Sequence, residues 1–139
     1  MTRTTVGNVG SVRTEVRIRR PAHEVWARIE DPSRIQEWFT GIVASSVDGA
    51  NRIVTLGSGL SMPEEIVTHD PIARRFQYRI TFPVFRQHLS TIDVIDLGDE
   101  TSLIVYAIDA EPRTFALMIG AAAGDALVEL RDQMEAGAT

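Results

Sequence analysis

Arg75-Phe-Gln-Tyr-Arg-Ile-Thr-Phe82 is the stretch that decides the fold, because polar and apolar residues alternate along it without a break. A repeat of two is the period of a β-strand, whose successive side chains point to opposite faces of a sheet. The sequence therefore predicts a strand with one buried face. That face carries four bulky side chains: Phe76, Tyr78, Ile80 and Phe82.

Strand and turn signals continue on both sides of this stretch. Candidate strands occupy 42–47, 52–56, 62–68, 87–96 and 101–109, with turn sequences such as Asp48-Gly49, Asp70-Pro71 and Gly98-Asp-Glu100 between them. Together with 75–82 they make six strands in series at short spacing, which is typical of an antiparallel meander. A further alternating segment, 11–19, precedes them and predicts a seventh strand.

Helical signals lie at the two ends of this series. Residues 22–30 place Val25, Trp26 and Ile29 on one helix face, and Asp31-Pro32 then ends that helix and caps a second short one that reaches about Trp38. After Pro112, apolar residues recur at intervals of three and four as far as Met134, which predicts a helix of roughly 20 residues. The predicted class is α+β, with the order β-α-α-β6-α.

Composition limits the class of protein. The chain has 139 residues, of which 44% are hydrophobic and 24% charged, as expected for one soluble domain at 11–139 behind a flexible N-terminus at 1–10. A net charge of −5 argues against a nucleic-acid binder. With no cysteine and no lysine, thiolate and Schiff-base chemistry are excluded.

The sequence also leads to expectations about the cellular location of the protein and about metal ions or cofactors. No long apolar run and no signal-peptide core occur, so we expect a cytoplasmic protein without integral membrane association. The three histidines, His23, His69 and His88, fall on different elements, so neither a metal site nor a cofactor is expected.

These elements and several local sequences resemble the START/Bet v 1-like (SRPBCC) superfamily, and within it the bacterial polyketide cyclase/dehydrase and lipid-transport family. The resemblance covers about 12–134. It rests on the element order together with Arg20-Pro-Ala-His-Glu-Val-Trp26, Trp38, Asp70-Pro71 with Arg74-Arg75, and Thr91-Ile-Asp-Val94 before Leu97-Gly-Asp99. It implies a helix-grip fold, in which a curved antiparallel seven-stranded sheet wraps around the long C-terminal helix and leaves a cavity. Members of such folds bind lipids, cyclise polyketides or assist chaperones.

In that arrangement, every second side chain of a strand points to the inner face of the sheet. This strand parity predicts which side chains line the cavity. The expected ligand-binding residues are Trp38, Phe39, Met62, Glu64, Ile66, Phe76, Tyr78, Ile80, Phe82, His88, Ser90, Ile92, Phe115 and Met118. The alternative is that the same apolar stripe only fills the core of a small domain.

Two polar residues are candidates for catalysis, although neither is assigned. His88, expected beside Ser90 and Tyr78, would orient a ligand carbonyl or act as a general base; otherwise it is a structural histidine held by hydrogen bonds. Glu64 shares parity with Met62 and should point inward, where burial would raise its pKa. Alternatively, a bulge at Pro63 sends both Glu64 and Glu65 to solvent.

Three functions follow as hypotheses. The first is binding of a small hydrophobic ligand, such as a lipid, polyketide or aromatic metabolite, by a monomer or weak homodimer. The second is a polyketide cyclase or dehydratase that uses pocket His, Glu and Tyr side chains. The third is a regulatory, protein-interaction or toxin–antitoxin component whose cavity is filled. A cavity of roughly 300 Å³ or more favours the first over the third.

Overall fold

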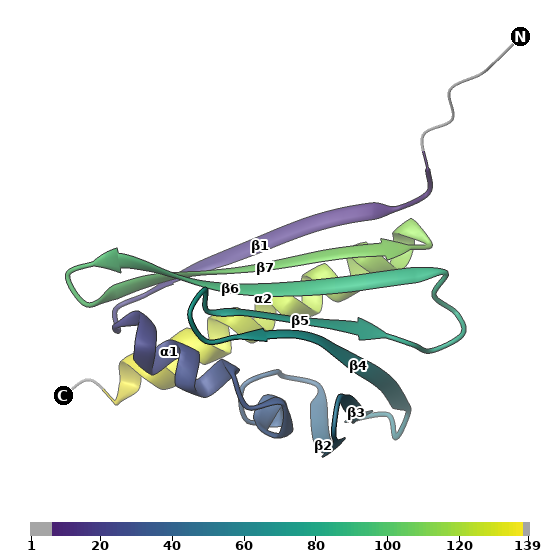
Figure 1. The fold of residues 1–139 in the computed structure, drawn as a ribbon, viewed down its shortest axis with the longest axis horizontal. Coiled ribbons are helices and arrows are strands. Elements are labelled where there is room, and N and C mark those ends of the chain that lie inside the picture. The colour runs from purple at the N-terminus through teal and green to yellow at the C-terminus, as the bar shows by residue number, and fades with distance from the viewer. Residues whose placement is uncertain (1–6, 138–139) are drawn as a thin grey trace, which may run out of the picture.

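A single antiparallel sheet organises residues 7–137, the part of the chain that the computed structural model describes (Figure 1). Within that part, seven strands pair in the order β1-β7-β6-β5-β4-β3-β2. The strands are β1 (Gly10–Ile18), β2 (Ile42–Asp48), β3 (Asn51–Leu56), β4 (Ser61–Asp70), β5 (Arg75–Ile80), β6 (Gln87–Gly98) and β7 (Thr101–Glu111). The meander from β2 to β7 is thus extended by β1, which adds to the far side of β7.

Three helices accompany the sheet within the described range. They are α1 (Ala22–Ile29), the 3₁₀ helix η1 (Pro32–Glu37) and the long α2 (Arg113–Ala136). Figure 1 shows α2 running along one face of the sheet, with α1 beside its C-terminal half. The predicted helix-grip fold, α+β with a curved seven-stranded sheet and a long C-terminal helix, is confirmed.

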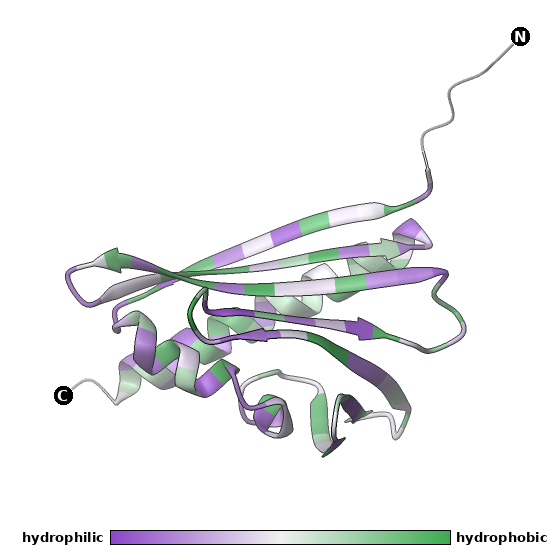
Figure 2. Cartoon of the chain, in the orientation of Figure 1, coloured by the Kyte–Doolittle hydropathy of each residue, from purple (hydrophilic) through white to green (hydrophobic). Residues whose placement is uncertain are grey.

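The alternation of the sequence accounts for the layering. Along β7 every second residue is buried, and the strands in Figure 2 carry alternating hydrophilic and hydrophobic bands. The inner face of the sheet and the inward side of α2 share one core, which includes Ile18, Trp26, Tyr106 and Leu127. Burying each such side chain stabilises the fold by about 1.5–3 kcal/mol.

The contact of α2 with β1 depends on a glycine. A Cβ atom at Gly120 would lie 2.6 Å from Cγ1 of Val12, so the helix approaches the strand as closely as its backbone permits. This contact holds the middle of α2 against one side of the sheet.

Several boundaries differ from the prediction. β5 ends at Ile80, so Phe82 lies beyond the strand, and the irregularity in β4 falls between Ile66 and Thr68 rather than at Pro63. Pro63 instead pairs in register with Ile53 of β3. Of the predicted flexible segment 1–10, residues 1–6 lie outside the described residues, and Gly10 already begins β1.

Candidate functional site

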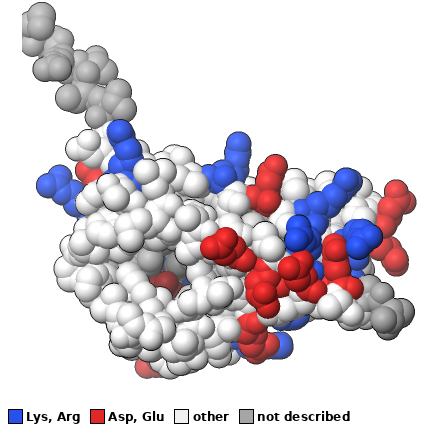
Figure 3. Space-filling model, turned by 180° about the vertical axis from the view of Figure 1, so that it is seen from behind, with Lys and Arg blue, Asp and Glu red and all other residues white. Residues whose placement is uncertain are grey.

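A cavity of about 430 Å³ lies between the sheet and α2. Figure 3 shows it from behind as a hollow whose surroundings carry few charges, with an acidic group visible inside. Its lining comes from the segment between η1 and β2, from β2 to β5 with the loop between β3 and β4, from the loop after β5 and from α2: Phe39, Ile42, Val54, Leu56, Leu60, Met62, Glu64, Tyr78, Ile80, Phe82, Val84, Phe85, Phe115, Met118, Ile119 and Ala122.

The position of the cavity follows from the way α2 packs. The helix contacts mainly β1 and β7, at one side of the curved sheet. Over β3, β4 and β5 the inner face is therefore left without a helix pressed against it. On the facing side of α2, the small side chain of Ala122 leaves space in the lining.

Eight of the residues expected from the sequence to bind ligand line this cavity: Phe39, Met62, Glu64, Tyr78, Ile80, Phe82, Phe115 and Met118. Met118 is nevertheless largely exposed, so it stands at the mouth. The other six are not in the lining: Trp38, Ile66, Phe76, His88, Ser90 and Ile92. Parity places most of these on the inner face, but that face is shared with the packed core, where Trp38, Phe76, His88, Ser90 and Ile92 are buried.

The charged residue in the lining is Glu64. Its side chain is 5% exposed, while Glu65 next to it lies at the surface. The strand is regular at this point, since Arg52, Ile53 and Val54 of β3 pair in turn with Glu64, Pro63 and Met62. Inward parity is therefore correct for Glu64, and the alternative of a bulge at Pro63 that exposes both carboxylates is wrong.

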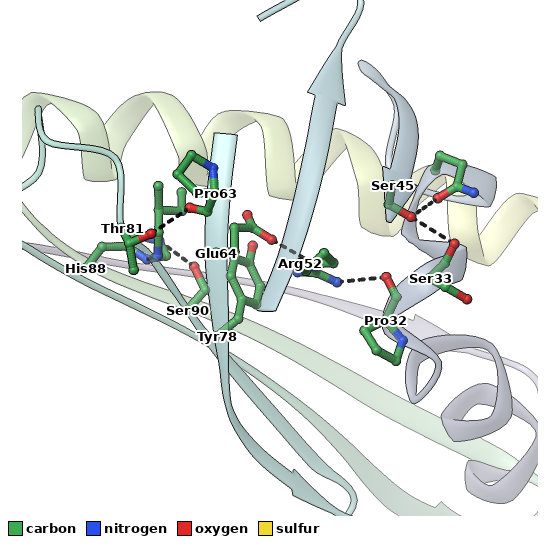
Figure 4. Close-up of polar contacts among 12 residues, drawn as sticks. Pro32, Ser33, Ser45, Arg52, Pro63, Glu64, Tyr78, Thr81, His88 and Ser90 are labelled. Carbon is green, nitrogen blue, oxygen red and sulfur yellow. Dashed lines mark hydrogen bonds and ion pairs between the residues drawn. The ribbon is translucent and has the colours of Figure 1, made fainter. Parts of the chain in front are cut away.

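Glu64 is held by Arg52, a residue that sequence reasoning missed. Nε of Arg52 donates to Oε1 of Glu64 over 2.7 Å, and the arginine side chain is 2% exposed. Its Nη1 donates to the Pro32 carbonyl oxygen at 3.2 Å, which ties β3 to η1 (Figure 4). The sequence contained a sign of this, because Arg52 lies two residues before Val54 on β3 and so points to the same inner face of the sheet.

Aromatic rings complete the surroundings of the guanidinium. Its carbon lies 4.8 Å from the ring centre of Tyr78 and 5.6 Å from that of Phe76, within the range of cation–π attraction. Among the described residues, Nη2 of Arg52 has no hydrogen-bond partner. Glu64 and the two ring faces thus balance the positive charge.

Burial and the neighbouring charge act on Glu64 in opposite directions. Loss of hydration raises the pKa of its carboxyl, while the Arg52 charge and hydrogen bond lower it, and the net direction is upward. The site therefore presents a carboxyl group that accepts hydrogen bonds and whose proton affinity is increased.

His88 belongs to a hydrogen-bond chain behind the cavity wall. The Ile80 backbone N–H donates to Nδ1 at 2.8 Å, so the ring proton lies on Nε2, which donates to Oγ of Ser90 at 2.9 Å (Figure 4). Burial lowers the pKa of His88 to about 4, and the ring is neutral near pH 7. Both ring nitrogens are thus engaged in hydrogen bonds, as expected if His88 is a structural histidine.

The two tyrosines of the chain are also joined in the interior. The hydroxyl groups of Tyr78 and Tyr106 hydrogen-bond to each other, and both residues are buried. Burial raises the pKa of Tyr78 to about 12, so its phenol stays protonated. Tyr78 thus offers the cavity its ring more than a free hydroxyl.

The described residues also bear on metal ligation and on membrane insertion. Residues 7–137 contain no group of three or more His, Asp or Glu side chains placed to hold a metal ion. Over the same range, no helix combines the length and hydropathy needed to cross a bilayer.

Comparison with known proteins agrees with the architecture. Residues 9–136 match the family described as "Polyketide cyclase / dehydrase and lipid transport". No curated protein matches the chain.

Solved structures show the same fold at low sequence identity. The protein XoxI from Bacillus cereus is 21% identical, with 89% of this chain and 94% of that chain covered and a TM-score of 0.82. The Zhui aromatase/cyclase from a Streptomyces species is 17% identical over 91% and 94% of the two chains, at a TM-score of 0.73. A START superfamily protein from Mycobacterium smegmatis is 16% identical over 91% and 94%, at 0.67.

Proposed function

The chain belongs to the polyketide cyclase/dehydrase and lipid transport family, and on this premise we propose that it binds a small hydrophobic ligand in the cavity between the sheet and α2. The observation that carries the proposal is the cavity itself. Its volume of about 430 Å³ falls in the range of small-molecule sites, which is about 300–1,000 Å³. An apolar lining with one buried carboxyl group suits a ligand that is mostly hydrocarbon or aromatic.

The open volume also bears on the competing hypotheses. A regulatory or toxin–antitoxin component with a filled cavity is less well supported, because the space over β3, β4 and β5 is not occupied by side chains. A catalytic role is the second candidate, and Glu64 is the observation in its favour. A carboxyl group with a raised pKa inside an apolar cavity is suited to move a proton on a bound polyketide chain.

Binding can be tested by closing the cavity. Ala122 faces it from α2, whereas the neighbouring Ala121 is exposed on the helix. We expect Ala122→Phe to abolish binding of an apolar fluorescent probe, and Ala121→Phe to bind the probe like the wild-type protein. Native mass spectrometry of protein incubated with lipid and polyketide extracts provides the second readout. Equal probe binding by both variants, or a protein that captures nothing, would refute the proposal.

The catalytic candidate has its own test. With a poly-β-ketone substrate that the protein converts, Glu64→Gln should remove turnover while the substrate still binds. His88→Gln should retain turnover, because His88 is hydrogen-bonded behind the wall. Turnover that survives in Glu64→Gln but is lost in His88→Gln would show that Glu64 is not the catalytic residue.

A further inference from the structure

We propose that the cavity selects neutral ligands that carry a hydroxyl group, and that Glu64 accepts the hydrogen bond of that hydroxyl. The inference rests on the proposed function and specifies the class of ligand. It follows from the way in which Glu64, Arg52 and Tyr78 divide their hydrogen bonds.

The two oxygens of the Glu64 carboxylate are in different situations. Oε1 accepts from Arg52, whereas Oε2 has no hydrogen-bond partner within residues 7–137. Figure 4 shows one carboxylate oxygen directed to Arg52 and the other directed away from it. Because Glu64 lines the cavity, a ligand can reach this second oxygen. This oxygen is open to the cavity, so a ligand hydroxyl can donate to it directly.

The Tyr78 hydroxyl is a weaker acceptor than the carboxylate and already has a partner. It is hydrogen-bonded to the Tyr106 hydroxyl in the interior. The other side chains that line the cavity are apolar, so Glu64 is the charged acceptor that it offers to a ligand.

Arg52 explains why an anionic ligand is disfavoured. Its guanidinium is almost fully buried and absent from the lining, so a ligand carboxylate meets Glu64 before it can reach the arginine. Two carboxylates in an apolar cavity repel each other. The Arg52 charge is at the same time already balanced by Glu64, so the pair presents no net positive field that would attract an anion.

The charge of Glu64 and the apolar walls together fit an alcohol or phenol. A hydrogen bond to a carboxylate oxygen that is paired with an arginine is among the stronger ones, the more so within apolar walls. We therefore expect a hydroxyl group to improve affinity by about tenfold to a hundredfold over the same hydrocarbon skeleton.

Three probes of one shape test the inference: naphthalene, 2-naphthol and 2-naphthoate. Their dissociation constants are measured by NMR titration at pH 7 with the wild-type protein. The double variant Arg52→Met/Glu64→Leu replaces the ion pair with apolar side chains of similar volume, a change that folded proteins often tolerate. The matched control Arg75→Met/Asp93→Leu removes a more exposed ion pair between β5 and β6.

We expect the wild-type protein and the control to bind 2-naphthol at least about tenfold more tightly than naphthalene, and 2-naphthoate most weakly. The double variant should bind naphthalene and 2-naphthol alike. Equal wild-type affinity for naphthalene and 2-naphthol, or preference for 2-naphthoate, overturns the inference and leaves cavity binding intact. A wild-type protein that binds none of the three contradicts the proposed function itself. The wild-type ranking decides between these outcomes even if the double variant does not fold.

Discussion

Arg52 and Glu64 stand directly opposite each other on β3 and β4 and form an ion pair of 2.7 Å that is almost completely removed from solvent. The pair lies between the cavity and the core: Glu64 faces the cavity, and Arg52 rests on the ring of Tyr78. Two buried charges of this kind depend on each other, because both side chains are largely shielded from bulk solvent.

Removing one member of the pair should be much more harmful than removing both. Arg52→Met or Glu64→Leu alone leaves a buried charge without its partner, and each is expected to lower the free energy of unfolding by about 3–5 kcal/mol. The double variant should lose far less. Urea unfolding of the two singles and the double, read as a double-mutant cycle, measures the coupling.

The same cycle on Arg75 and Asp93 provides the control. Their pair is partly exposed on the outer side of the sheet, and its coupling should be no more than about 1 kcal/mol. Additive effects at Arg52 and Glu64 would contradict the interdependence described above.

The neutral state of His88 should make stability depend on pH. Burial lowers its pKa from the model-compound value of 6.5 to about 4, so below pH 6.5 the unfolded chain takes up a proton that the folded protein does not. The stability that the neutral His88 gives to the folded protein is fully present above pH 6.5 and is lost as the pH falls toward 4. Between pH 7 and pH 5 the loss is about 2 kcal/mol.

The measurement compares urea unfolding of the wild-type protein and His88→Gln at these two pH values. The variant should lose about 2 kcal/mol less than the wild type on acidification. His23→Gln changes a histidine that is exposed on α1 and is the matched control. The same loss in H88Q and in the wild type would mean that His88 titrates in the folded state as it does in the unfolded chain.

The hydroxyl groups of Tyr78 and Tyr106 should behave as one unit. Tyr78→Phe leaves the Tyr106 hydroxyl buried without this partner, which costs about 1–3 kcal/mol. Removing both hydroxyls, in Tyr78→Phe/Tyr106→Phe, leaves neither of them unpaired and should cost less than twice the single change. If the loss of stability in the double variant equals the sum of the losses in the two single variants, the hydrogen bond between the two hydroxyl groups contributes nothing significant.

Two glycines of α2 should respond differently to the same substitution. A Cβ at Gly120 would lie 2.6 Å from Val12 Cγ1, whereas at Gly124 the nearest atom is Thr14 Oγ1 at 3.4 Å. Replacing glycine by alanine within a helix gains about 1 kcal/mol, but overpacking against a β-branched side chain costs about 1–3 kcal/mol. Gly124→Ala should therefore be the more stable variant in thermal unfolding, and the opposite order would mean that α2 does not press on β1 at Gly120.

The elements of this fold could be predicted because each has a local cause. The alternation at 75–82, the capping residue Asp31 before Pro32 and the spacing of apolar residues after Pro112 depend on neighbours in the chain. Asp31 does accept from the Ser33 backbone N–H at 2.9 Å, as an N-cap should.

The depth of each side chain could not be predicted in the same way. Phe76 and Tyr78 have the same parity on β5, yet only Tyr78 lines the cavity, because the course of α2 over the sheet decides where space remains. Arg52 was overlooked for a related reason: a charged residue on an alternating strand is usually exposed, and its pairing with Glu64 depends on the register of β3 and β4. The cytoplasmic location and the monomer or weak homodimer stay predictions.

The pairing of β1 with β7 has a consequence for the order in which the protein can form. Gly10 pairs with Ala110, so the first strand finds its partner only after about a hundred residues have been synthesised, and the closure of so long a loop slows folding. During translation the middle strands leave the ribosome with their apolar face uncovered, since α2 follows them in the chain. Uncovered apolar strands are prone to aggregation, and the cavity between the sheet and α2 can form only when that helix has emerged.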